Sequence, residues 1–322
     1  MSNFVAMRDS FLERLHESMK EYKNSVFLCA DFGSPVVDRI RRDFPDRCIN
    51  VGIAEQNLIN VGTGLALEGY SVFLYAIAPF ITMRCYEQIR VNIAILQEVR
   101  KMNITLIGVG AGCSYVVSGP THQCFEDLSV MRTLPNIEVI SPSDHHLSAA
   151  VVDYALKDLG GCGARYLRLD AQLQNEIYTK ECATSVLQNG LCEIIKGSDL
   201  CIVSTGYMTH QALKVAAEFN RDGSKVGVID FVKFLNFNTS ELLSVLKRYR
   251  KIITLEEGFK GKGGLDNLIQ DFVFEHHLSR EHDLASMGIP PRYGFQLGSR
   301  EDIHTAYGIG RDQIAQKVKM LL

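Results

Sequence analysis

The stretch Ser71–Ile77 reads SVFLYAI, and the stretch Asn103–Val109 reads NITLIGV. Both are continuous apolar runs without the apolar–polar alternation of a strand that faces water on one side. Between them, residues 80–100 have the length and apolar spacing of a long helix. Two buried strands joined by a helix predict a parallel sheet that helices cover on both faces.

The same alternation continues on both sides of this unit. We expect further strands at 25–30, 137–140 and 165–169, with helices at 58–67 and from 144 to about 157. From Asp170 to about Gly190 the residues become polar and mixed, which is typical of a linker. A second series follows, with strands at 200–204, 225–231 and 251–255 and helices at 209–219, 240–249, 265–274 and 300–322. The predicted fold class is therefore α/β, as two doubly wound α/β domains with mostly parallel sheets, and the boundaries are 1–178, a linker at 179–190, and 191–322.

Length and composition limit the classes of function. A chain of 322 residues is long enough for two domains with a core each. The formal net charge of −3 gives no reason to expect nucleic acid or an anionic membrane as a partner. Residues 1–20 have the pattern of an amphipathic helix and not of a signal peptide, so we expect a cytoplasmic chain. The nine cysteines contain no C-x-x-C pair, so we expect reduced thiols and no metal site.

Two short motifs carry residues suited to chemistry. The segment Val51–Asn57 reads VGIAEQN and places Glu55 among small apolar residues. Buried carboxylates resist ionising and cluster at functional sites, although the dipole of a helix N-terminus also favours a glutamate at this position. The second motif, Gly119–Gln123, reads GPTHQ. Its Gly-Pro fixes a loop, and histidine is a side chain that can donate a hydrogen bond or move a proton.

These motifs belong to an ordered set. GIAEQ at 52–56, the helix from Phe80 to Arg90, GPTHQ at 119–123 and ISPSD at 140–144 follow one another at family-like separations. Together they resemble the transketolase superfamily of thiamine diphosphate enzymes, which includes deoxyxylulose-phosphate synthase. The resemblance extends to VIDF at 228–231, TLEEG at 254–258 and GSRE at 298–301. It implies a pyrimidine-binding domain followed by a transketolase C-terminal domain.

The resemblance assigns cofactor roles to three residues. Glu55 would hydrogen-bond the ring nitrogen N1′ of the aminopyrimidine and favour its imino tautomer, which activates the cofactor. Phe80 matches an aromatic residue that stacks on this ring, although it also fits a core position, and Ile81 or Tyr75 are alternative neighbours of the ring. Asp31 resembles an acid at a strand end near the thiazolium, and a turn aspartate is an equal alternative.

On the substrate side, the resemblance implies that His122 points at the reacting carbons, where it donates to a hydroxyl or moves a proton. Gln123 follows it in the same motif. The family loop commonly reads DGPTHQ, and here Ser118 stands where its aspartate contacts a sugar hydroxyl. Arg168 matches an arginine that binds a phosphate or carboxylate end. GVGAG at 108–112 lacks the basic residue that helps to hold phosphate, which indicates an altered substrate.

The two histidine doublets of the chain have a simpler interpretation. They are His145-His146 and His276-His277. Neighbouring residues on a helix do not share a face, so we expect no joint function from either doublet.

The chain contains no Gly-Asp-Gly, the motif that opens the magnesium- and diphosphate-binding loop in this superfamily. The stretch GKGG at 261–264 lacks the spacing of a P-loop. The resemblance therefore implies the C-terminal subunit of a split transketolase. A separate N-terminal subunit would hold most of the Mg²⁺ and diphosphate contacts, and we expect an α2β2 heterotetramer in which this chain self-associates.

Three alternatives remain open from the sequence. One is the beta subunit of a 2-oxo-acid dehydrogenase, which would transfer an acyl group to lipoamide. Another is a deoxyxylulose-synthase-like enzyme that decarboxylates pyruvate, so the substrate is either a sugar or a keto acid. The third is a non-catalytic scaffold that keeps the fold, although it would not need Glu55, His122 and Arg168.

Overall fold

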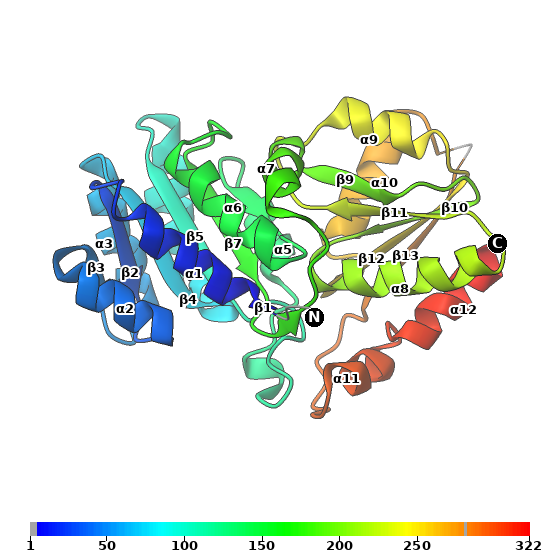
Figure 1. The fold of residues 1–322 in the computed structure, drawn as a ribbon, viewed down its shortest axis with the longest axis horizontal. Helices are drawn as coiled ribbons and strands as arrows, with labels where there is room; N and C mark the ends of the chain where they lie inside the picture. Colours follow the sequence, from blue (N-terminus) through cyan, green and yellow to red (C-terminus); the bar gives the residue numbers. More distant parts are fainter. Residues whose placement is uncertain (1–4, 280–281) are drawn as a thin grey trace.

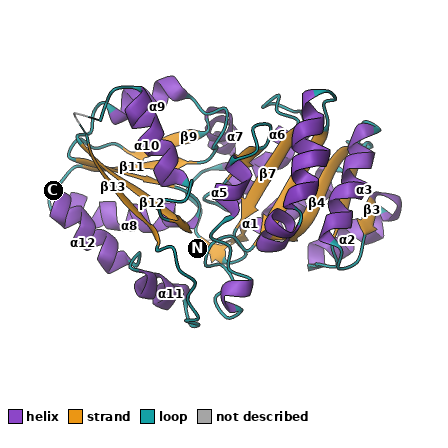
Figure 2. Cartoon of the chain, turned by 180° about the vertical axis from the view of Figure 1, so that it is seen from behind, coloured by secondary structure: helices purple, strands orange, loops and turns teal. Residues whose placement is uncertain are grey.

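The computed structural model describes residues 5–279 and 282–322 (Figure 1). Two α/β units lie beside each other, each with a sheet that carries helices on both faces (Figures 1 and 2). The prediction of two α/β units with mostly parallel sheets is confirmed. In the part of the chain described, no helix combines the length and the apolar character that a membrane span requires.

The first unit holds a six-stranded sheet in the order β3-β2-β4-β5-β7-β6, and every neighbouring pair is parallel. The strands β4 and β5 at its centre are almost completely buried, as their apolar runs predict. The strands are β2 (Ser25–Cys29), β3 (Cys48–Asn50), β4 (Ser71–Ile77), β5 (Asn103–Val109), β6 (Glu138–Ile140) and β7 (Ala164–Leu169). The helices are α1 (Met7–Ser18), α2 (Pro35–Asp43), α3 (Glu55–Leu67), α4 (Tyr86–Gln88), α5 (Asp127–Arg132) and α6 (His145–Leu156).

The second unit holds a five-stranded sheet in the order β13-β12-β10-β11-β9, in which only β9 runs antiparallel to its neighbour. Its strands are β9 (Leu191–Ile195), β10 (Leu200–Ser204), β11 (Val226–Phe231), β12 (Lys251–Phe259) and β13 (Asp283–Ile289). The helices are α8 (Tyr207–Arg221), α9 (Thr239–Leu246), α10 (Leu265–Glu275), α11 (Arg300–Tyr307) and α12 (Arg311–Leu321). Two short strands, β1 (Val5–Ala6) and β8 (Leu173–Gln174), pair separately.

The segment expected to be a linker contains the helix α7 (Lys180–Asn189), which packs against α6. Thr179 is the N-cap residue, and its backbone N–H donates to Cys182 Sγ at 3.3 Å; Gly190 in the left-handed conformation ends the helix. Its buried stripe is only Ala183, Val186 and Leu187, which is too narrow to stand out in a polar sequence. The division of the chain into domains at 178 and 191 stays a prediction.

Three other expectations differ from the structure. The predicted helix 80–100 is divided into π-helical turns at Phe80–Arg84 and Ile89–Ile95 with α4 between them. The last helix is interrupted at Gly308, whose φ of 76° ends α11. The elements α2, β3, α5, β9 and β13 were not expected, because short or partly polar segments carry little periodicity.

The two units share a hydrophobic core. The cluster on one face of the first sheet continues into the second unit through Phe231 and Phe234. The backbone joins them too, because Phe234 N–H donates to the Val139 carbonyl at 3.0 Å and Ser141 N–H donates to the Val232 carbonyl at 2.8 Å. The contact between the two units is therefore buried like a protein core. A functional site is more accessible at the edges of the two sheets.

Candidate active site at the carboxyl edge of the first sheet

Four neighbouring parallel strands end at one edge of the first sheet. Because β3, β2, β4 and β5 are adjacent and parallel, the segments that follow them meet at this edge. Asp31 follows β2, Glu55 follows β3, Phe80 follows β4, and the loop with His122 follows β5. In Figure 1 this loop lies below the first unit.

Glu55 is the first residue of α3 and only 4% exposed. Its Oε2 accepts a hydrogen bond from Arg84 Nη1 at 2.7 Å. The thiol of Cys85 lies nearby, and burial, with a smaller contribution from the Glu55 charge, raises its pKa to about 12. The acid therefore stands in a largely apolar setting with one cationic partner.

Arg84 connects Glu55 to the aromatic residues of the site. Its guanidinium lies over the Phe80 ring, 4.5 Å from the centroid. The rings of Phe80 and His122 meet edge to face with centroids 5.4 Å apart, and Tyr115 meets His122 in the same way at 6.3 Å. The structure thus brings three predicted residues, Glu55, Phe80 and His122, into one continuous row.

The sequence did not reveal Arg84. Its only local signal is a cation four residues after an aromatic residue, and the π-helical turn that sets their contact is not visible in the periodicity. The alternatives to Phe80 can be compared by burial. Ile81 and Tyr75 are completely buried, whereas Phe80 is partly exposed. Phe80 is therefore the one of the three whose ring reaches the surface of this edge.

Asp31 lies in a turn and has a positive φ of 50°. Its backbone N–H donates to Asn50 Oδ1 at 3.0 Å, and its carboxylate accepts from Asn50 Nδ2 at 2.9 Å. These bonds link the ends of β2 and β3 and match the turn interpretation. A cofactor role for Asp31 stays a prediction.

The loop with the second motif carries three of the expected substrate residues, and these residues differ in burial and in hydrogen bonding. Ser118 is exposed, and Gly119 has a φ of 69° that turns the chain into the motif. His122 Nδ1 lies 2.9 Å from Thr121 Oγ1. Gln123 is 3% exposed, and both polar atoms of its side chain lack a partner among the described residues. An unpaired buried amide is costly, which makes Gln123 a candidate for contact with a bound group.

Arg168 lies apart from this row, inside the contact between the two units. It is 4% exposed, and its Nε donates to Asp127 Oδ2 at 2.7 Å. Tyr166 donates to the same oxygen at 2.9 Å. The guanidinium therefore already has a buried carboxylate partner, and the geometry gives no support to the expected contact with a substrate anion.

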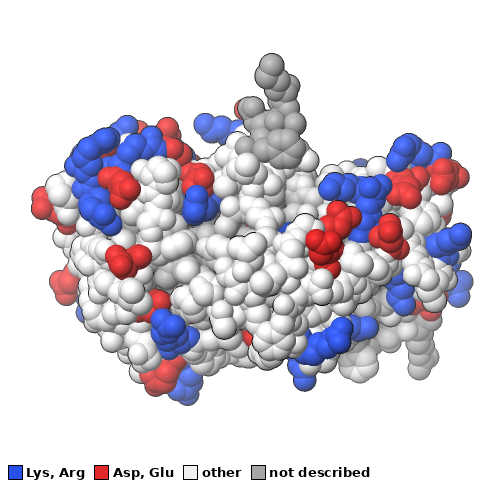
Figure 3. Space-filling model, turned by 90° about the horizontal axis from the view of Figure 1, so that it is seen from below, with Lys and Arg blue, Asp and Glu red and all other residues white. Residues whose placement is uncertain are grey.

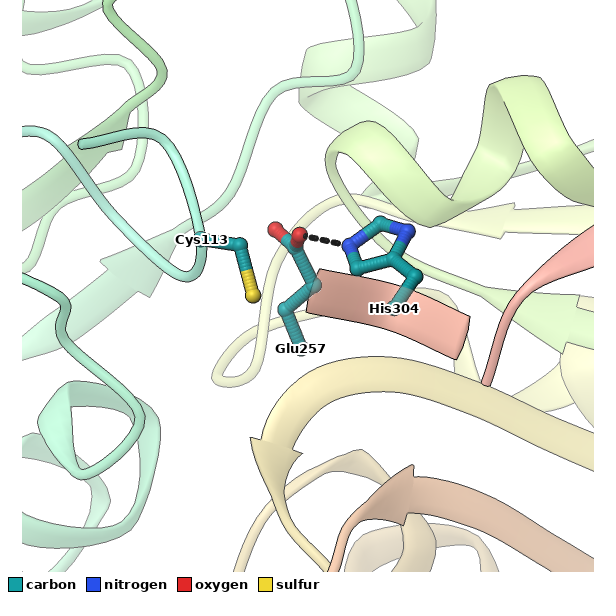
Figure 4. Close-up of side chains that lie close together, drawn as sticks. All are labelled: Cys113, Glu257 and His304. Carbon is teal, nitrogen blue, oxygen red and sulfur yellow. Dashed lines mark hydrogen bonds and ion pairs between the residues drawn. The ribbon is translucent and has the colours of Figure 1, made fainter. Parts of the chain in front are cut away.

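A second charged cluster joins the two units (Figure 4). Arg300 donates to both oxygens of Glu257 at 2.8 and 2.5 Å, and His304 Nε2 lies 2.5 Å from Glu257 Oε1. Asp170 of the first unit accepts from Arg300 at 2.5 Å, and Cys113 lies beside Glu257. Burial alone would raise the pKa of Glu257, but Arg300 and His304 hold it well below its usual range. Each charge in this cluster has its partner within the chain.

Comparison with known proteins agrees with this division into two units. Residues 4–173 match the family model of the transketolase pyrimidine-binding domain, and residues 191–314 match that of the transketolase C-terminal domain. A putative transketolase C-terminal section from Methanocaldococcus jannaschii is 28% identical over 316 residues, which cover 98% of this chain and 96% of the relative.

Two further similarities extend over almost the whole chain. One of the subunits of the apulose-4-phosphate transketolase of Actinobacillus succinogenes is 28% identical over 98% of this chain and 97% of its own length. A solved structure of a split-gene transketolase, an inactive beta4 tetramer, superposes with a TM-score of 0.85 at 26% identity and covers 99% of both chains.

Proposed function

The chain belongs to the transketolase family, and on this premise we propose that it is the C-terminal subunit of a two-component transketolase-like enzyme that depends on thiamine diphosphate. The enzyme would transfer a two-carbon ketol or acyl unit to an aldehyde or ketone acceptor of the sugar class. One observation carries the proposal: the buried Glu55 lies in one row with Phe80 and His122 at the carboxyl edge of a parallel sheet.

The residues of this row suit an aminopyrimidine. A carboxyl group can share a proton with a ring nitrogen of such a heterocycle, and an accessible aromatic ring can stack on its face. Glu55 and Phe80 supply these two groups, and the buried amide of Gln123 has polar atoms left to pair. Thiamine diphosphate, when bound, supplies the carbanion-stabilising chemistry of the reaction.

Each protein group has a defined task in this proposal. The Glu55 carboxyl group shares a proton with N1′ of the pyrimidine, and it must first exchange its bond to Arg84 for that contact. Phe80 presents its ring for stacking. Because Nδ1 of His122 faces the Thr121 hydroxyl, Nε2 is the atom left to hydrogen-bond a substrate hydroxyl and to move a proton. Gln123 and Ser118 complete the substrate side as proposed contacts.

The edge is also flanked by exposed apolar side chains, which indicates a surface that another chain covers. Ile53 is 79% exposed, Val117 is 75% exposed and Phe295 is 82% exposed. Seen from below, charged side chains gather toward the two ends of the face, and a broad uncharged area lies between them (Figure 3). Apolar surface of this kind is typical of protein–protein contacts.

We propose that a separate subunit with the diphosphate-binding domain docks here and holds most of the Mg²⁺ and diphosphate contacts. The absence of Gly-Asp-Gly from the sequence supports this division of labour. The relative that is one subunit of apulose-4-phosphate transketolase, together with the beta4 tetramer, supports an assembly of separate chains. For this assembly we propose α2β2 with self-association of this chain.

Calorimetry tests the proposal directly. The chain alone should bind thiamine diphosphate weakly, whereas a mixture with a partner that carries Gly-Asp-Gly should bind it tightly in the presence of Mg²⁺. Tight binding by the chain alone would contradict a split site. Assays of the mixture with ketose donors and with pyruvate then identify the donor, because only a decarboxylating reaction releases carbon dioxide.

A further inference from the structure

Within the described residues, two clusters bring three side chains of metal-binding type together. They are Cys113–Glu257–His304 and His145–His146–Glu176, and in each cluster the candidate ligand atoms lie within 4.8 Å of one another. The first cluster is closed to a cation, because Arg300 binds both oxygens of Glu257 and His304 binds one of them. A metal ion would have to displace a buried guanidinium there. The second cluster is open.

We propose that His145, His146 and Glu176 bind a divalent transition-metal ion, and that Zn²⁺ is the ion that suits this ligand set. Two imidazoles and one carboxylate are zinc ligands, and a set of three leaves a fourth position for water or another ligand. The site is independent of the proposed thiamine diphosphate chemistry.

His145 is the buried member of the site. It is 8% exposed, and its Nδ1 is buried without a hydrogen-bond partner in the described part of the chain. Within the described residues, one nitrogen atom of this ring is therefore left without a partner, as a metal ligand requires.

The two histidines share a face, contrary to the expectation from the sequence. Their ring centroids are 4.0 Å apart, with an angle of 38° between the rings. They are the first two residues of α6, where no preceding turn of the helix occupies the space beside them. The rule that neighbours point apart holds inside a helix and fails at this end.

Asp144 holds the third ligand in place. It is the N-cap of α6 and is completely buried, and its Oδ1 accepts from Leu147 N–H at 2.8 Å. Its Oδ2 accepts from the backbone N–H groups of Ile177 and Tyr178 at 2.9 and 2.8 Å. One carboxylate thus fixes both the helix that carries the histidines and the segment that carries Glu176. The backbone that carries the ligands is therefore fixed before any ion binds.

Two carboxylates stand at the site itself. Glu176 Oε2 already lies 3.4 Å from His146 Nε2. A cavity of about 470 Å³ opens beside the histidines between α1, α6 and α7, and its carboxylates Asp9, Glu13 and Asp153 are paired with Arg8, Arg39 and Arg14. The positive end of the α6 dipole opposes an ion here, and the negative charges of Asp144 and Glu176 offset it.

Titration of the full chain with Zn²⁺ after removal of bound metal tests the site. We expect one ion per chain by calorimetry, and an affinity at least about tenfold lower in His146→Ala and in Glu176→Gln. Both side chains reach solvent, so these variants should fold normally. His276→Ala, in the other histidine doublet, is the matched control and should bind as the unchanged chain does.

X-ray absorption at the zinc edge supplies a second readout. Ligands at about 2.0–2.2 Å with no sulfur shell support the histidine and carboxylate set, whereas a shell at about 2.3 Å assigns the ion to cysteines and overturns the proposal. Equal affinity in His146→Ala, Glu176→Gln and His276→Ala also overturns it.

Discussion

Two glutamate–arginine pairs stand in opposite surroundings in this chain. Glu257 and Arg300 are joined at 2.8 and 2.5 Å inside the contact between the units, where the Arg300 side chain is 4% exposed. Glu55 and Arg84 are joined at 2.7 Å at an open edge, where the Arg84 side chain is 46% exposed. The first pair is complete within the chain, and the second has an accessible partner that can be exchanged. In the proposed function, the same chemistry therefore serves structure at the closed pair and binding at the open one.

The largest expected effect concerns catalysis at the open pair. In the reconstituted enzyme, Glu55→Gln should lower kcat by roughly 10²–10⁴-fold, because the amide cannot exchange a proton with the pyrimidine. The free energy of unfolding should change by about 1 kcal/mol or less, since Arg84 is half exposed. Steady-state kinetics and urea unfolding measure the two quantities.

The Arg84→Met variant distinguishes the contribution of the Glu55 carboxyl group from that of its ion pair. This variant loses the bond to Glu55 but keeps the carboxylate, so its kcat should fall far less than that of Glu55→Gln. Turnover near that of the unchanged chain in Glu55→Gln would contradict the assignment of the open pair to catalysis.

At the closed pair the effect should be on stability. Arg300→Ala leaves the Glu257 and Asp170 carboxylates buried without their guanidinium, and we expect a loss of about 3–5 kcal/mol in the free energy of unfolding. The control is Arg311→Ala, whose partner Glu218 lies 3.0 Å away on the surface and which should cost about 0–1 kcal/mol. Similar losses of stability in Arg300→Ala and Arg311→Ala would show that the buried pair contributes no more than a surface pair.

Glu256, next to Glu257 on β12, should make the free energy of unfolding depend on pH. Burial raises the pKa of Glu256 from 4.5 to about 7. Between these values the folded chain holds a proton that the unfolded chain releases. The stabilisation is therefore complete below about pH 4.5 and is lost as the pH rises through 7, by roughly 3 kcal/mol in total.

Glu256→Gln replaces the protonated acid with a neutral group that can still accept from Asp266 N–H. We expect a flatter profile of unfolding free energy from pH 5 to 8, with the variant more stable than the unchanged chain at pH 8. Some slope should remain, because burial also raises the pKa of Asp230 to about 6. Parallel profiles for the two proteins would show that Glu256 is charged throughout.

The features that the sequence predicted correctly depend on short, local segments of the chain. The buried runs of β4 and β5 follow from seven consecutive residues each, and the motifs around Glu55 and His122 lie within short segments next to strand ends. Because parallel strands end at one edge, the fold brings these motifs together after β3 and β5, although the sequence did not predict β3 itself.

What the sequence did not predict depends on distant partners or on irregular backbone. Arg168 is separated by 41 positions from Asp127, and only the fold shows that this carboxylate occupies it. Arg84 reaches Glu55 across 29 positions through a π-helical turn. The shared face of His145 and His146 depends on their place at a helix end, which a rule for helix interiors does not describe.

The smallest expected effect concerns Phe80, and the chain offers a close match for it. Arg84 lies over Phe80 at 4.5 Å and His122 meets its ring at 5.4 Å, while Arg47 lies over Phe44 at 4.7 Å and His16 meets that ring at 5.5 Å. Both phenylalanines are partly exposed.

Phe80→Leu and Phe44→Leu thus remove similar contacts within the chain, one at the proposed active site and one away from it. Only Phe80→Leu should raise the Kd of the reconstituted enzyme for thiamine diphosphate, by roughly two- to twelvefold for the loss of one aromatic contact of about 0.5–1.5 kcal/mol. Calorimetry measures the Kd, and urea unfolding should show comparable losses of stability in both variants. An unchanged Kd in Phe80→Leu would mean that its ring only supports Arg84, and the stacking residue would then have to be sought on the partner subunit or elsewhere along the edge.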